Sequence, residues 1–166
     1  MLIKERRFRI NVSYRMFQIA GITSYEHVGG DTDLVCRGPS GGVLPVDSLG
    51  NDFAPTVLMQ LWDGTPAPVD NHPDHAVYRV EVTGQVHLVA LMVGLSPDGP
   101  FPVPHGAWTV HLWRDGSRAH LSSEGALLPG DDDEYTYTGD DFPGEAVESW
   151  VVQFCPAGGE QQLLSG

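Results

Sequence analysis

The chain has 166 residues, enough for one domain with a sizeable core, and its formal net charge is -13. Twenty glycines and 13 prolines interrupt the sequence, and no apolar run is long enough to cross a membrane. The N-terminal residues (MLIKERRFRI) contain no apolar segment followed by a cleavage site, so we expect no secretory signal and a cytoplasmic location.

The first third of the chain combines an amphipathic strand with a long loop. Residues 7–18 alternate, and the apolar set that we expect to face the core is Phe8, Ile10, Val12, Tyr14 and Met16. This alternation is typical of an antiparallel sheet with one solvated face. Residues 24–51 have loop composition, except for a short apolar piece at 43–46 whose proline restricts it to a sheet edge.

Strand periodicity is strongest in the middle of the chain and returns near its end. The segments predicted as strands are 53–62, 77–83, 86–93, 108–113 and 148–155. A tight reversal is predicted at Gly84 and Gln85, between two of these strands. Trp108 and Trp150 fall on the inward side of their strands, so we expect both to be buried.

These segments predict an all-β fold, because the connections are rich in turns and helical periodicity is almost absent. The predicted architecture is a two-sheet antiparallel β-sandwich of jelly-roll or Greek-key type, with a closed barrel as the alternative. No repeat or linker divides the chain. We therefore expect one domain over residues 1–156 and a flexible tail at 157–166.

Several motifs resemble the bacterial competence protein J family. They are SYRMFQ at 13–18, the strand 77–83 with its turn into 86–93, PVPHGAWTVHLW at 102–113, and an apolar last strand. The type member of that family inhibits the DNA-entry nuclease. The resemblance implies a β-sandwich that binds and inhibits, or regulates, another protein such as a nuclease-type enzyme. A longer loop at 24–52 and an acidic segment at 124–148 depart from the family's pattern.

Charge is distributed unevenly along the chain. The first 18 residues are basic, whereas no lysine or arginine follows Arg118 and carboxylates accumulate there. This distribution does not suit a nucleic-acid binder that neutralises phosphates. It favours electrostatically steered encounter with a basic protein partner.

Acidic and aromatic side chains between residues 131 and 141 form the predicted partner-binding site. Closely spaced carboxylates suit the lysines and arginines of a target, and tyrosine is enriched at interfaces. The predicted residues are Asp131, Asp132, Asp133, Glu134, Tyr135, Tyr137, Asp140 and Asp141. A solvated loop without a role and a calcium loop are the alternatives, although the spacing does not follow the EF-hand pattern.

An alternative binding site involves Trp62, Trp113 and His111. Strand alternation places these side chains on the outward side, where aromatic rings can stack on a small ligand or a carbohydrate. Salt dependence distinguishes this alternative from a protein-binding acidic surface, since stacking is hardly screened by ions.

The sequence contains no pattern that we assign to a metal, another cofactor or catalysis. His72 and His75 lie three residues apart, but no third ligand follows at a suitable spacing. A nucleophile elbow and a phosphate loop are also absent, so we expect a protein that is not an enzyme. Cys36 and Cys155 are expected to be thiols in a cytosolic protein, while sequence leaves open whether they pair.

Overall fold

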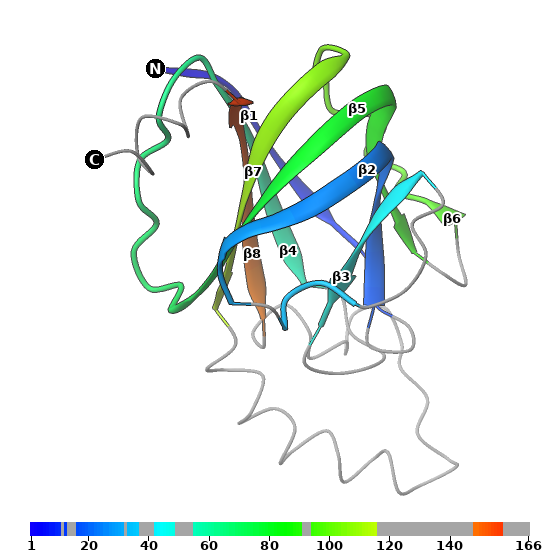
Figure 1. Ribbon diagram of the computed structural model, residues 1–166. Helices are drawn as coiled ribbons and strands as arrows, with labels where there is room; N and C mark the ends of the chain where they lie inside the picture. Colours follow the sequence, from blue (N-terminus) through cyan, green and yellow to red (C-terminus); the bar gives the residue numbers. More distant parts are fainter. Residues whose placement is uncertain are drawn as a thin grey trace, which may run out of the picture.

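A computed structural model describes residues 1–10, 12, 16–31, 33–36, 42–48, 55–90, 94–115 and 148–157. These residues form β-strands and contain no α-helix (Figure 1). The strands are β1 (Leu2–Arg9), β2 (Met16–Gly30), β3 (Val43–Asp47), β4 (Thr56–Trp62), β5 (Asp74–Ala90), β6 (Gly94–Leu95), β7 (Gly106–Asp115) and β8 (Ser149–Pro156). Within the described ranges, no helix is long and apolar enough to span a membrane.

Hydrogen bonds join these strands into one open sheet. The order is β1-β4-β8-β7-β5-β2-β3, and β6 pairs with β5. The all-β prediction is confirmed, but the purely antiparallel pairing is wrong, because β4 and β8 run parallel. These two strands are far apart in sequence, and the chain between them supplies the crossover that parallel neighbours require. The ladder is also continuous, where the sequence predicted two separate sheets.

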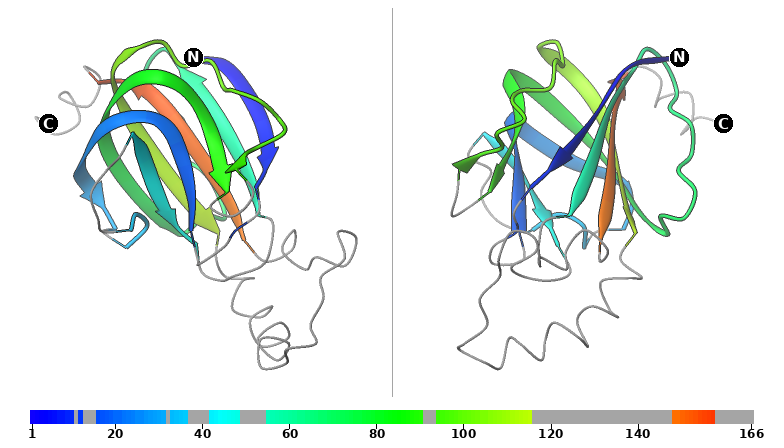
Figure 2. Two further views of the ribbon diagram at one scale, coloured as in Figure 1. Left: turned by 90° about the vertical axis from the view of Figure 1, so that its right-hand side faces the viewer. Right: turned by 180° about the vertical axis from the view of Figure 1, so that it is seen from behind.

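The sheet turns a corner where β2 and β5 bend together (Figure 2). Ile22 pairs with Val82 and Ala20 with His87, so residues 83–86 of β5 lie opposite Gly21 alone. Gly21 has a φ of +93°, and a Cβ there would lie 2.4 Å from the Gln85 carbonyl oxygen. The reversal predicted at Gly84 and Gln85 is therefore wrong. The chain bends at this bulge but continues as one strand.

One core lies between the two halves of the bent sheet. Phe17 of β2 packs edge-on against Trp150 of β8 with ring centroids 5.6 Å apart. Phe101 contacts Phe8 of β1 at 6.3 Å and Phe154 of β8 at 6.5 Å. Trp150 is buried as predicted, whereas Trp108 is only partly buried against the core.

The predicted strand at 7–18 is two strands. Phe8, Ile10 and Val12 are buried as expected, but β1 ends at Arg9 and β2 begins at Met16. At the start of β2 the buried side chains are those of Phe17 and Ile19, the opposite parity to the prediction. The two strands have different neighbours, since β1 pairs with β4 and β2 with β3 and β5, so their registers are set independently.

The region predicted as a loop is partly strand. β2 continues to Gly30, so the first residues of the predicted loop at 24–51 are part of a strand. The short apolar piece forms β3, and its predicted edge position is confirmed by its place at the end of the strand order. Of the predicted tail, only residue 157 belongs to the described part of the chain.

Candidate functional site

The outer face of β5 and β7 carries a stack of aromatic rings. His75 and Trp113 are register partners on these antiparallel strands, and His111 lies diagonally across from His75. The His75 ring lies over the Trp113 ring with centroids 3.7 Å apart and planes inclined by 8°. We call His75, His111 and Trp113 the histidine–tryptophan cluster.

The two histidines share one hydrogen bond. His75 Nε2 lies 3.0 Å from His111 Nδ1, and the rings are inclined by only 11° with centroids 5.2 Å apart. This combination places the imidazoles edge to edge, so one ring must donate and the other accept. Burial, and then the neighbouring His75, lower the pKa of His111 to about 4. Burial also lowers the pKa of His75, and Asp31 opposes that shift.

Two glutamines connect the cluster to Trp62. Gln153, which is 1% exposed, accepts a hydrogen bond from Trp113 Nε1 at 2.8 Å. Its amide donates to Gln60 Oε1 at 3.1 Å and to the Ala67 carbonyl at 2.8 Å. Trp62 Nε1 donates to the same Gln60 oxygen at 3.0 Å.

This network limits what the outer face can bind. Both indole N–H groups have partners within the chain, and one face of Trp113 is covered by His75. The Ala67 bond also holds the loop after β4 against β8. A stacking ligand would therefore have to use the remaining partly exposed ring surface, or displace His75.

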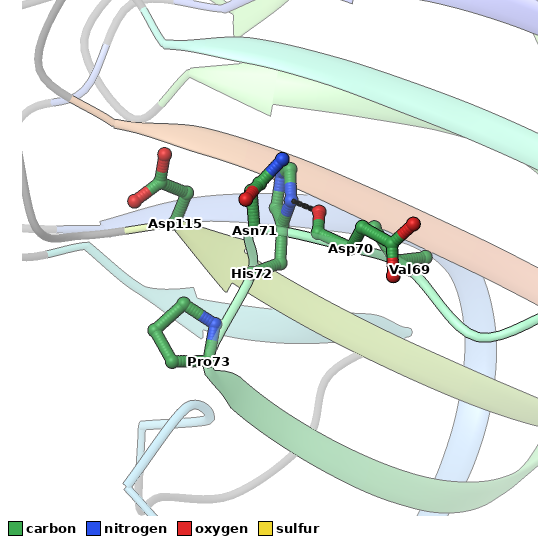
Figure 3. A pocket seen from close by; sticks show the side chains of 6 residues that line it. All are labelled: Val69, Asp70, Asn71, His72, Pro73 and Asp115. Carbon is green, nitrogen blue, oxygen red and sulfur yellow. Dashed lines mark hydrogen bonds between the residues drawn. The ribbon is translucent and has the colours of Figure 1, made fainter.

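Beside this face lies an open pocket of about 560 Å³ (Figure 3). Its lining residues are Val69, Asp70, Asn71, His72, Pro73 and Asp115. His72 uses both ring nitrogens, Nδ1 at 2.9 Å from the Asp70 carbonyl and Nε2 at 3.0 Å from Ser149 Oγ. The ring of His75 contacts His111 instead, so the two histidines of this motif do not converge. Among the described residues, no group of three or more His, Cys, Asp and Glu side chains is arranged to hold a metal.

The flanks of the acidic segment are fixed at one end of the sheet. Asp115 and Ser149 are register partners on β7 and β8, so the described residues on either side of 116–147 lie side by side. Next to Asp115, the buried Arg114 directs Nε and a terminal guanidinium nitrogen to the Asp74 carboxylate, each at 2.9 Å.

The returning flank is held by a buried carboxylate. Glu148 is 2% exposed and accepts hydrogen bonds from Ser48 Oγ at 2.7 Å and Trp150 Nε1 at 2.9 Å. Residues 131–141, the predicted partner-binding site, lie outside the described residues. The predicted site therefore stays a proposal.

Sequence reasoning named Trp62, Trp113 and His111 but missed His75, Gln60 and Gln153. The predicted strand begins at residue 77, whereas β5 begins at Asp74 and includes His75. Extending the strand alternation two residues before Val77 would have placed it on the outer face. The glutamines carry no local sign of their role, because it depends on the pairing of β4, β8 and β7.

The two cysteines differ in exposure. Cys155 is buried and Cys36 is partly buried, and both are thiols. The Cys36 Sγ lies 4.0 Å from Asp47 Oδ1.

No family model matches this chain, and no curated protein sequence matches it. Among solved structures, it is similar to ComJ from Bacillus subtilis, described as an inhibitor of the DNA degrading activity of NucA. The identity is 13% and the TM-score 0.55, and the alignment covers 95% of this chain and 98% of ComJ. A second structure, described as Crocagin biosynthetic gene J, has 12% identity and a TM-score of 0.47 over 93% of this chain and 99% of that one. The resemblance to the competence protein J family is thus confirmed at the level of the fold.

Proposed function

We propose that this chain is a non-catalytic acidic β protein that binds and inhibits, or regulates, a basic protein partner such as a nuclease-type enzyme. The observation that carries the proposal is the fold shared with ComJ over nearly the whole of both chains. At this low identity the likeness supports a class of function, and the partner must be argued from this chain's own charges.

The charge pattern supports a basic partner. No lysine or arginine follows Arg118, while acidic residues gather between 124 and 148. Carboxylates gathered in sequence without neighbouring cations repel one another. A partner surface rich in lysine and arginine would relieve that repulsion and would be attracted from a distance.

The attachment of the acidic segment supports its use as an interface. Arg114, beside Asp115, and Glu148 make buried polar contacts on the two sides of residues 116–147, and Asp115 and Ser149 are register partners. These contacts hold the chain on both sides of the stretch that contains the acidic residues. The small-ligand alternative around Trp62 and Trp113 has less support, because both indole N–H groups are already bonded to glutamines.

The test begins by isolating a partner from lysate at low salt and identifying it by mass spectrometry. Binding kinetics are then measured at two salt concentrations for the wild type and a variant with Asp131, Asp132 and Asp133 replaced by Asn and Glu134 by Gln. We expect the variant to associate more slowly and with a weaker dependence on salt, because steering acts mainly on the association rate.

A matched control removes the same amount of charge elsewhere. Glu5, Glu26, Asp63 and Glu81 lie on the surface, outside residues 116–147, and their replacement by Gln or Asn changes the net charge equally. We expect this control to slow association less than the quadruple variant does. Equal association rates for wild type and quadruple variant at low salt would remove the acidic segment from the interface. Inhibition assays with the purified partner then test the inhibitory role itself.

A further inference from the structure

Strand β1 has an open edge. It stands first in the strand order and, within the described ranges, pairs on one side only, with β4. The left view of Figure 2 shows β1 at the outer margin of the sheet. An edge of this kind presents main-chain N–H and C=O groups on which another strand can pair.

Two hydrogen bonds establish which residues face that edge. The Ile10 N–H donates to the Pro55 carbonyl at 3.4 Å, on the β4 side. The Arg9 N–H instead donates to the Asp98 carboxylate at 3.3 Å, away from β4. Main-chain groups alternate between the two sides of an antiparallel strand, and the register from Lys4 to Arg9 is unbroken. The N–H and C=O groups of Glu5 and Arg7 therefore point to the open edge.

The side chains of β1 indicate the kind of strand that fits. Four cations, Lys4, Arg6, Arg7 and Arg9, accompany the single acid Glu5 in a chain whose net charge is -13. Near one end, Leu2 and Ile3 are 37% and 57% exposed. A basic edge with exposed apolar side chains matches an extended segment in which carboxylates alternate with apolar residues.

The molecule already contains one contact of this chemistry. The carboxylate of Asp98 accepts the Arg9 N–H, and the Arg6 guanidinium donates to the carbonyl oxygens of Asp98 and Pro100. An acidic residue of the same chain thus occupies one end of the edge. A second copy of β1 would fit poorly, because it would bring arginines and lysines against their like.

We propose that the open edge of β1 binds an extended acidic segment of a partner protein by strand addition, with the N–H and C=O groups of Glu5 and Arg7 as its main-chain contacts. This inference goes beyond the proposed inhibitor function, because it uses a surface of opposite charge and no residue between 116 and 147. A protein segment is favoured over a nucleic acid because the edge offers main-chain pairing groups at strand spacing.

The probe is a fluorescent peptide of about eight residues, a usual strand length, in which glutamate alternates with valine. Its binding is followed by fluorescence anisotropy at low salt. The variant Arg7→Pro removes the charge of Arg7 and one main-chain donor, which points to the open edge, where proline is tolerated, so we expect an unchanged melting temperature. We expect the peptide to bind about tenfold more weakly to this variant, as a main-chain bond and its register are lost.

Charge reversal provides the second variant and its control. Arg7→Glu should weaken peptide binding by tenfold or more, roughly the effect of placing like charges opposite each other. Arg79→Glu makes the same change on β5, away from the edge, where Arg79 is 42% exposed, and should have little effect. A peptide N-methylated at alternate amides tests the same main-chain bonds without altering the protein, and it should not bind.

Four results would overturn the proposal. One is equal binding of the peptide to wild type and Arg7→Pro. The second is equal binding when lysine replaces glutamate in the peptide. The third is self-association of the chain in sedimentation that Arg7→Pro abolishes, which would make a second copy the occupant. The last is tighter binding of a single-stranded DNA oligonucleotide that Arg7→Glu abolishes, which would make the edge a phosphate site.

Discussion

His111→Asn should make the stability of the protein less sensitive to acid. In the wild type, His75 Nε2 lies 3.0 Å from His111 Nδ1. A side-chain atom of asparagine can lie near the position of His111 Nδ1, so the variant can keep a hydrogen-bond partner for His75. The titrating imidazole is lost. The perturbation therefore removes a proton-binding group from the outer face while leaving the hydrogen bond to His75 possible.

The magnitude follows from the lowered pKa of His111. Burial and His75 bring this pKa to about 4 in the folded state, below the ordinary value of 6.5. The unfolded state therefore takes up the proton first as the pH falls. The free energy of unfolding that depends on His111 is intact above about pH 6.5 and is lost as the pH approaches about 4. The full difference corresponds to at most about 3 kcal/mol, an upper bound because His75 titrates together with it.

The assay is denaturant unfolding of wild type and His111→Asn at a series of pH values between about 4 and 7. Acidic side chains titrate in both proteins, so the difference between the two curves isolates His111. We expect this difference to move in favour of the variant by up to about 3 kcal/mol on acidification. His105→Asn, at an exposed position, is the control and should follow the wild type. Parallel curves for wild type and His111→Asn would refute the assignment of a buried neutral pair.

Three further changes test the fold and its polar network. Gly21→Ala should lower the free energy of unfolding by more than about 1 kcal/mol in excess of the effect of Gly94→Ala. Both residues have positive φ, but only at Gly21 would an added Cβ collide with main-chain atoms. Equal melting temperatures of the two variants would contradict the close approach at the corner. Trp150→Ala should cost about 3–5 kcal/mol and Trp108→Ala less, because only Trp150 is fully buried, and denaturant unfolding gives both values. Gln153→Leu should cost about 1–3 kcal/mol by leaving the Trp113 indole N–H and the Ala67 carbonyl without this partner, and should alter tryptophan fluorescence; an unchanged spectrum would place the network elsewhere.

The strands that sequence predicted well are those whose alternation is set locally. In β4, apolar side chains recur at every second residue and the buried positions match that pattern, and in β7 Val110 and Leu112 are buried as the alternation predicts. The sequence also suggested a turn at Gly84 and Gln85, where the structure has a bend. A bulge and a two-residue reversal both favour glycine between two apolar runs, so local sequence cannot distinguish them. The deciding contact, that of Gly21, comes from β2, far away in the chain.

The candidate site was only partly accessible from sequence, because it depends on register between strands. Trp113 and His111 were assigned outward from alternation alone, and the structure places both there. Their contacts with His75 and Gln153 require β5 and β8 to flank β7 in one particular alignment. The parallel pairing of β4 with β8, which brings Gln60 beside Gln153, joins segments that carry no sign of each other.

Two oppositely charged surfaces on one small sheet have a consequence for measuring affinity. Added salt weakens the attraction of a basic partner to the acidic segment and that of an acidic strand to β1 alike. A salt titration of the wild type therefore cannot tell the two contacts apart. Variants can, because neutralising Asp131 to Glu134 lowers attraction for a basic partner, whereas Arg7→Glu lowers attraction for an acidic one. The two Arg7 variants also separate the main-chain contribution at β1 from the charge contribution. Arg7→Pro removes the charge and an N–H group directed to the open edge, whereas Arg7→Glu keeps that N–H donor. A partner whose binding falls in both Arg7 variants pairs with the edge of β1, and one affected only by neutralising Asp131 to Glu134 does not use that edge.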